Sequence, residues 1–400
     1  MDIPHPTERA SLDAFVQIAG ANAWRDRLDR LRAAAQTREG RQSLQRHGIE
    51  LVIDRLRTGL PNRALSAAER RILAHAAEAA TLFAQLSAEG KQRFEQVLSA
   101  ALTGNACLVP LFHLLRTAAL QRSRGFEVVF AGLEHGAPFD LLIARAGVEA
   151  EVVCDVVSAE EGHCVHRGAW FQLVDRVDPE LQTWLRAHPG RYILKLTFPL
   201  GLKTSSPGEH GLLPALHARI SQMLGQQRRA DGDEAAVLRL DPLMLAAAQA
   251  DELGLMPRLR QEFGPEAHLA VTTAGGGVFV MAARAGQQND VAVAVRRRMA
   301  TMVPARLSGT RPGIIAMFIE DTDRNEWRLL RERLELEGEA RQFMTNPEAR
   351  GVVAVTCSSR LELFGIPEPD AAPDGELRFR NPAHPAAKTA ALAAAILSSV

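Results

Sequence analysis

The feature that most constrains the fold is a run of three short predicted strands between residues 125 and 162. Apolar, β-branched segments at residues 126–130, 139–144 and 148–157 are separated by turn segments that contain glycine. Such segments, bounded by glycine and proline, are typical of β-strands. The sequence therefore predicts a sheet at this point, and the rest of the chain is expected to be organised around it.

The third of these strands carries an unusual line of acidic residues. Glu149, Glu151 and Asp155 occupy alternate positions, so their side chains point to one face of the strand. Asp140 is placed to join them from the neighbouring strand. Carboxylates this close raise one another's pKa or require a cation. This face of the sheet is therefore the best candidate for a functional site.

The segments around these strands set the expected fold class, which is α+β. Residues 1–104 have apolar positions at helical spacing and predict a helical N-terminal region that serves packing or dimerisation. Residues 105–366 alternate strands and helices and predict an α/β core, with a helical insertion at about residues 200–265. Proline, aspartate and alanine dominate residues 367–400, which predicts an irregular tail.

Three later segments add detail to the predicted core. Residues 268–273 and 278–283 flank an Ala-Gly-Gly-Gly turn, which predicts a β-hairpin. Residues 313–319 are entirely apolar, as expected of a buried central strand. The acidic residues 320–323 that follow are interpreted as the N-terminal charges of the next helix.

Composition narrows the class of protein. The chain has 47 basic and 47 acidic residues, which argues against a strongly basic nucleic-acid protein but allows a local basic patch. The best such patch is Arg296, Arg297 and Arg298, although a solvated helix face is the common meaning of such a run. The four cysteines lack CxxC spacing and are expected to be reduced thiols. No signal peptide or apolar membrane span is recognised, so a cytoplasmic location without a membrane partner is expected.

The order of elements from residue 111 to 158 resembles the core of the PD-(D/E)XK nuclease superfamily. In that family a strand ends near an aspartate, and the next strand carries Glu-x-Lys. Asp140, in the sequence Pro-Phe-Asp, stands one residue from where the Pro-Asp element would be, and Glu151 or Val153 stands where the glutamate would be. The helix bearing Arg296–Arg298 and the strand at residues 313–319 resemble the helix and strand that close such a core.

The resemblance implies a restriction-endonuclease-like mixed sheet with a Mg²⁺ site formed by Asp140 and Glu151, supported by Asp155 or Glu149. Magnesium prefers such oxygen ligands, and it would polarise a phosphate and activate water. The motif's lysine is missing, and Lys195 from a later strand is the candidate catalytic substitute. The acidic residue often present on the preceding helix is also absent.

These observations favour a nucleic-acid-directed protein with reduced or lost catalysis. Any remaining activity would be Mg²⁺-dependent phosphodiester hydrolysis on DNA or RNA. The first alternative is a non-catalytic scaffold or protein-interaction module, with a protein partner or a second copy of the chain. The second is an unrelated α/β domain whose strand carboxylates face solvent.

Overall fold

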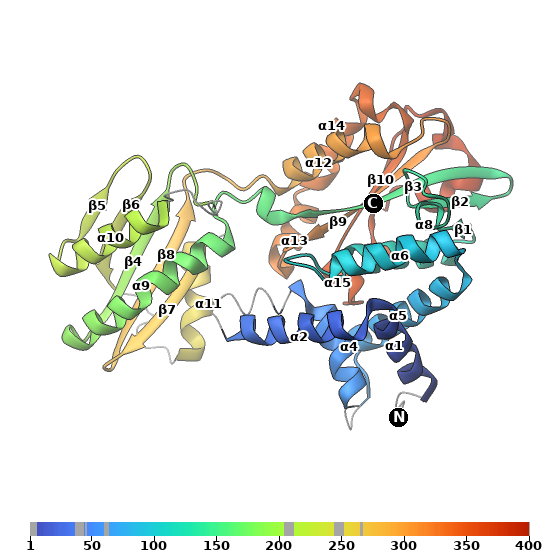
Figure 1. Ribbon diagram of the computed structural model, residues 1–400. Coiled ribbons are helices and arrows are strands. Elements are labelled where there is room, and N and C mark those ends of the chain that lie inside the picture. The colour runs from blue at the N-terminus through green and yellow to red at the C-terminus, as the bar shows by residue number, and fades with distance from the viewer. Residues whose placement is uncertain are drawn as a thin grey trace. The chain divides into compact units, whose positions relative to one another are not determined.

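A computed structural model describes residues 6–36, 44, 46–59, 64–203, 212–243, 252–264 and 267–399. The fold is α+β, as the sequence predicts (Figure 1). The chain forms two compact units, Met1–Glu161 with Ala292–Val400, and Gly162–Val291.

The N-terminal part of the first unit is helical. Its helices are α1 (Pro6–Ala19), α2 (Ala21–Ala35), α4 (Gly48–Thr58), α5 (Ala67–Gln85), α6 (Ala88–Ala101) and α7 (Val109–Ser123). Helix α5 begins at a capping box, in which the Ser66 hydroxyl accepts from the Glu69 N–H and the Glu69 carboxylate accepts from the Ser66 N–H. The apolar side chains of these helices share one buried core with the sheet that follows. The helices therefore belong to the same compact unit as that sheet.

The first sheet has six strands and contains the three strands predicted around residues 126–157. Its strands are β1 (Glu127–Val129), β2 (Leu141–Arg145), β3 (Val148–Ser158), β9 (Gly313–Glu320), β10 (Val352–Ser359) and β11 (Leu377–Arg380), in the order β1-β2-β3-β9-β10-β11. Strands β3, β9 and β10 are parallel, and the other neighbouring pairs are antiparallel. Every residue of β9 is buried, so the predicted central strand is confirmed.

Helices cover both faces of this sheet (Figure 1). Leu141, Ile143, Ala150 and Val152 point to the face covered by α7 and the N-terminal helices. Helices α12 (Val291–Arg306) and α14 (Glu335–Met344) lie on the opposite side, where the acidic side chains of β3 point. The described residues of this unit also form the α-helices α8 (Ala131–His135), α13 (Arg324–Glu332), α15 (Arg360–Leu363) and α16 (Ala393–Ile396).

The second unit contains its own five-stranded sheet, in the order β5-β6-β4-β8-β7. Its elements are α9 (Arg167–Ala187), β4 (Arg191–Phe198), α10 (Leu212–Gly225), β5 (Ala230–Gly232), β6 (Val237–Pro242), α11 (Glu252–Phe263), β7 (His268–Ala274) and β8 (Gly277–Ala285). The predicted hairpin is confirmed as β7–β8. Gly275 and Gly276 both have positive φ in its turn, a conformation that glycine adopts without strain.

The second unit differs from the helical insertion expected at about residues 200–265. The second unit spans Gly162–Val291, more of the chain than the predicted insertion. Within residues 200–265 it contains the strands β5 and β6 as well as helices. In β6, Leu238 and Leu240 are buried while Val237 and Arg239 are exposed, which is the two-residue period of a strand. The alternation spans only six residues and lies between stretches with helical spacing, so the sequence did not predict this strand.

The C-terminal segment also differs from the irregular tail expected after residue 366. Its strand β11 pairs with β10, and it buries Leu377 and Phe379. Composition rich in proline and alanine concealed this short edge strand. Among the helices described, none is long and apolar enough to cross a membrane.

Candidate functional site

Asp140, the first predicted metal ligand, immediately precedes β2 and is paired with an arginine. Its Oδ2 accepts hydrogen bonds from the Cys154 N–H and from Nη2 of Arg306, both at 2.7 Å. The same guanidinium donates through Nε to the carbonyl of Pro138 at 2.6 Å. Burial raises the pKa of Asp140, whereas Arg306 and the Cys154 N–H favour the ionised form. Arg306 therefore supplies the cation that this carboxylate needs.

Asp155, predicted as a supporting ligand, is held by a second arginine. Arg298 of α12 donates through Nε to Oδ2 at 2.6 Å and through Nη2 to Oδ1 at 3.0 Å. This two-pronged geometry is the strong form of an arginine–carboxylate pair. The hydrogen bonds raise the pKa of Arg298. Both oxygens of Asp155 are thus engaged by one guanidinium.

Glu151, the second predicted catalytic carboxylate, is fully buried and anchors a loop. Its Oε2 accepts from the Ser308 N–H at 2.9 Å, and its Oε1 accepts from the Ser308 hydroxyl. Nη1 of Arg311 lies 3.7 Å from Oε1, while Nε of Arg311 donates to Glu149 at 2.7 Å. Glu151 therefore fixes the connection between α12 and β9.

The acidic face of the sheet is thus neutralised from within the chain. Arg298, Arg306 and Arg311 come from one segment and reach carboxylates that the sequence places about 140 to 170 residues earlier. In the part of the chain that the structure describes, no group of three or more His, Cys, Asp or Glu side chains is arranged to hold a metal ion. As they stand, Asp140 and Asp155 do not fit a Mg²⁺ site, because a metal would have to displace two guanidinium groups.

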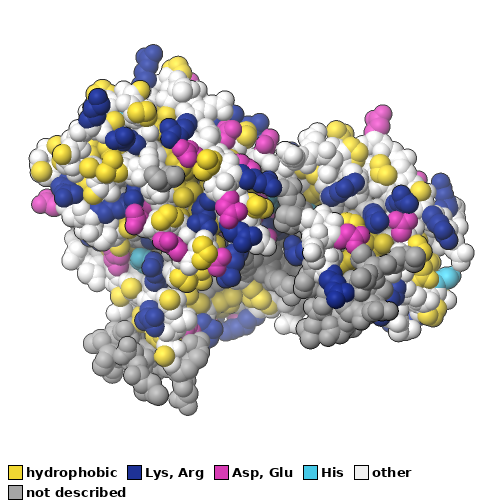
Figure 2. All heavy atoms as spheres, turned by 180° about the vertical axis from the view of Figure 1, so that it is seen from behind, with side chains coloured by type: hydrophobic (Ala, Val, Ile, Leu, Met, Phe, Trp, Pro, Cys, Tyr) yellow, Lys and Arg dark blue, Asp and Glu magenta, His cyan; other side chains and the backbone are white. Residues whose placement is uncertain are grey.

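Two of the three arginines in the predicted basic patch also form ion pairs with acidic side chains. Arg296 pairs with Glu339 at 2.5 Å, and Arg298 pairs with Asp155. The Arg297 side chain is exposed and forms no ion pair with a residue in the described ranges. Figure 2 shows basic and acidic side chains interspersed over the face it presents, without a continuous basic surface. Arg297 is therefore the member of the patch whose charge is not engaged by a carboxylate of the described residues.

Lys195 does not stand beside the predicted carboxylates in their sheet. It lies on β4, which belongs to the sheet of the second unit. In the first sheet, the strands next to β3 are β2 and β9. Its Nζ lies 3.3 Å from Oδ2 of Asp241 and 5.8 Å from the centre of the Phe263 ring. The interpretation of Lys195 as a substitute from a neighbouring strand is wrong, because the chain leaves the first sheet after β3.

A second polar cluster lies where the parallel strands β3, β9 and β10 end. Glu320, the last residue of β9, is 3% exposed. Its Oε1 accepts from the Cys107 thiol at 3.3 Å and lies 3.8 Å from both Nε of Arg46 and Nη2 of Arg360. Burial raises the pKa of Glu320. The carboxyl ends of parallel strands are where ligands commonly bind in open α/β sheets.

Asp321 extends this cluster and has an unusual backbone. Its φ is 62°, a left-handed value that is rare for a residue other than glycine. Its Oδ2 accepts a hydrogen bond from the Ser158 hydroxyl at 2.7 Å. Asp323 begins α13 by accepting from the Glu326 N–H, as the sequence predicts, whereas Glu320 ends β9 and Asp321 accepts from Ser158. The signal for the cluster was present in the sequence, since Glu320 and Asp321 directly follow an apolar strand.

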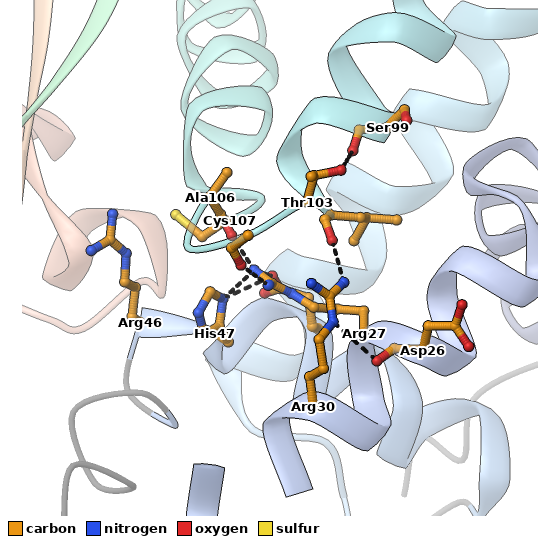
Figure 3. A network of polar contacts seen from close by, with 12 residues as sticks. Asp26, Arg27, Arg30, Arg46, His47, Ser99, Thr103, Ala106 and Cys107 are labelled. Atoms are coloured by element: carbon orange, nitrogen blue, oxygen red, sulfur yellow. Dashed lines mark hydrogen bonds and ion pairs between the residues drawn. The ribbon is translucent and has the colours of Figure 1, made fainter. Parts of the chain in front are cut away.

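Two arginines of α2 support the turn that carries Cys107 (Figure 3). Arg27 donates to the carbonyls of Gly104, at 2.7 Å, and Ala106, and it contacts Nδ1 of His47 at 2.9 Å. Arg30 donates to the carbonyl of Leu102 at 2.9 Å. Carbonyl groups just after a helix lack intrahelical partners, and cations stabilise them. This network therefore fixes the segment after α6 that presents Cys107 to Glu320.

No protein-family model matches this chain, and comparisons with curated proteins and with solved structures find no match.

Proposed function

We propose that this protein is nucleic-acid-directed and built on a nuclease-like core that has lost metal-dependent catalysis. The observation that carries the proposal is a pair of ion pairs. Nη2 of Arg306 lies 2.7 Å from Oδ2 of Asp140, and Nε of Arg298 lies 2.6 Å from Oδ2 of Asp155. An arginine that neutralises a carboxylate at such a distance takes the place of the metal in the charge balance of the site.

The order and pairing of the strands support the nuclease-like part of the proposal. Helix α7 is followed by the antiparallel strands β1, β2 and β3, and α12 then leads into β9, which pairs with β3. This is the order that the resemblance implies, with the second unit inserted between β3 and α12.

The residues of β3 support the loss of catalysis. The register of β2 and β3, continued by one residue from the pair Leu141 and Val152, places Asp140 opposite Val153. Val153 is buried and apolar, and the next residue on that face is Asp155. A glutamate and a lysine would be needed at these two positions. Val153 therefore supplies no metal ligand, and Asp155 supplies no cation that could orient water.

Exposed arginines beside this face support contact with phosphate groups. Arg297 is exposed, and the side chains of Arg298 and Arg311 remain 44% and 40% exposed while paired. Paired arginines contribute little net charge, so binding should be weak and should depend on salt. Arginine is nevertheless the side chain best suited to phosphate.

The same pairing favours a second candidate, a scaffold that acts through protein contacts. Arg296 and Arg298 are held by acidic partners, and the whole chain has 47 basic and 47 acidic residues. Such a protein would have no measurable affinity for nucleic acid at low salt.

One experiment separates these functions. Purified protein is mixed with fluorescein-labelled single- and double-stranded DNA and RNA, with Mg²⁺ or Mn²⁺, at salt concentrations from about 50 to 200 mM. We expect weak binding that decreases with salt and with Arg297→Ala, and no cleavage. Cleavage that Asp140→Ala abolishes would contradict the loss of catalysis. Absence of binding at the lowest salt would favour the scaffold.

A further inference from the structure

Helix α7 carries a buried polar stripe on the side that faces the sheet. Arg116, Thr117, Gln121 and Arg124 follow His113 by three, four, eight and eleven residues, so all five share one face of the helix. His113 locates this face, because its Nε2 lies 2.9 Å from the carbonyl of Ala316 on β9. A helix packed between other helices and a sheet is expected to present apolar residues there. The stripe therefore requires an explanation.

Arg116 is the least satisfied member of the stripe. The residue is 5% exposed, and its Nη2 donates to the carbonyl of Gly375. Its Nε and Nη1 are buried and have no hydrogen-bond partner among the residues described. Nη2 of Arg124 is also buried and has no hydrogen-bond partner among the residues described, although its Nη1 donates to Glu376 at 2.6 Å. Two neighbouring guanidinium groups thus have unused N–H donors in the interior.

Arg116 carries its charge in the interior. Burial lowers its pKa, Arg71 and Arg124 lower it further, and Glu376 and Glu362 raise it. Glu362 cannot turn toward Arg116, because its two oxygens accept hydrogen bonds from Trp327, Ser359 and Ala372. Glu376 is engaged with Arg124. A buried cation without a matching anion is strongly unfavourable.

We propose that a small monovalent inorganic anion of chloride size binds between Arg116 and Arg124, beside the turn that contains Gly375. Such an ion would accept from the unused N–H groups of both arginines and offset part of their buried positive charge. Because these N–H groups are buried, a single-atom ion is favoured over a larger oxyanion. Nδ1 of His113 and Oε1 of Gln121 are unpartnered acceptors, which take water and not the anion.

The test is the dependence of stability on chloride at constant ionic strength. Sodium chloride is exchanged for sodium gluconate, whose anion is too large for the site, and the urea midpoint of the full chain is measured. An anion that binds only the folded state raises this midpoint as its concentration increases. We expect this rise in the wild type and in the control Arg122→Met, whose arginine is exposed at the end of α7. We expect it to be absent in Arg116→Met.

A second measurement does not depend on a variant that folds. The ³⁵Cl resonance of the wild-type solution should be broadened by exchange with the site, and bromide should remove the excess linewidth. A midpoint that does not respond to chloride, together with no excess linewidth, would overturn the proposal and leave water as the sole occupant. A chloride effect that persists unchanged in Arg116→Met would show that the ion binds elsewhere.

Discussion

At the scale of single residues, the acidic line of β3 is explained by its partners. Asp155, Asp140 and Glu149 each meet a different arginine, and Glu151 receives a hydroxyl and a backbone N–H. The sequence identified the carboxylates correctly as groups that need a cation. It could not identify the cations, because Asp140 and Arg306 lie 166 residues apart and no local pattern joins them.

Burial of a neutral histidine gives a prediction about pH. Burial lowers the pKa of His113 to about 4, because the charged form would lie in the interior. In the unfolded chain histidine has a pKa of about 6.5. As the pH falls from 6.5 toward 4, the unfolded state gains a proton that the native state does not, so stability decreases. Between pH 7 and pH 5 we expect this residue to account for a loss of about 2 kcal/mol.

The measurement is the free energy of unfolding in urea at pH 7 and pH 5 for the wild type and His113→Gln. Glutamine keeps an N–H donor for the carbonyl of Ala316 but does not titrate. The variant should lose about 2 kcal/mol less than the wild type over this interval. Equal losses in the two proteins would show that His113 is not held neutral in the fold.

At the scale of elements, the connection from α12 to β9 depends on a buried carboxylate. Ser308 donates both its hydroxyl and its backbone N–H to Glu151, which is fully buried. Removing the hydroxyl in Ser308→Ala should leave an oxygen of this carboxylate undersatisfied and cost about 1–3 kcal/mol. The control is Ser123→Ala, an exposed serine at the end of α7, which should change stability by about 0.5 kcal/mol or less. Equal effects of the two substitutions in urea unfolding would refute the anchoring role of Glu151.

Which elements the sequence could predict follows from how local their signals are. The strands around residues 126–157, the buried strand β9 and the β7–β8 hairpin each carry a pattern within about ten residues, and each is present. Strand β6 has an equally local pattern, but it spans only six residues beside helical stretches. The position of Lys195 in a separate sheet could not be predicted, because strand order depends on contacts between distant segments.

At the scale of the whole molecule, the second unit has the properties of an inserted domain. It contains its own apolar core, which includes Trp170, Phe198 and Phe279. Its two ends meet, because the Asp290 N–H donates to the carbonyl of Gly162 at 2.8 Å. A domain with adjacent ends can leave the surrounding fold uninterrupted. The first sheet therefore continues from β3 to β9 across an insertion of about 130 residues.

Residues 162–291, expressed alone, should therefore fold. We expect cooperative thermal unfolding followed by circular dichroism, because the core of this unit is supplied by its own helices and strands. The matched control is the same fragment with Trp170→Ala, which removes one of its largest fully buried side chains and should cost about 3–5 kcal/mol. A fragment without cooperative unfolding would contradict the assignment of this unit as a self-contained domain.

The most direct test of the central claim is a calorimetric titration of Mn²⁺ into the wild type, Arg298→Gln/Arg306→Gln and the same double variant with Asp140→Asn. If the two arginines stand in place of a metal, the wild type should bind no Mn²⁺ at millimolar concentration. The double variant should gain a site, because Asp140 and Asp155 lose their cations, and Asp140→Asn should remove that site again. Stoichiometric Mn²⁺ binding by the wild type that Asp140→Asn abolishes would contradict the account.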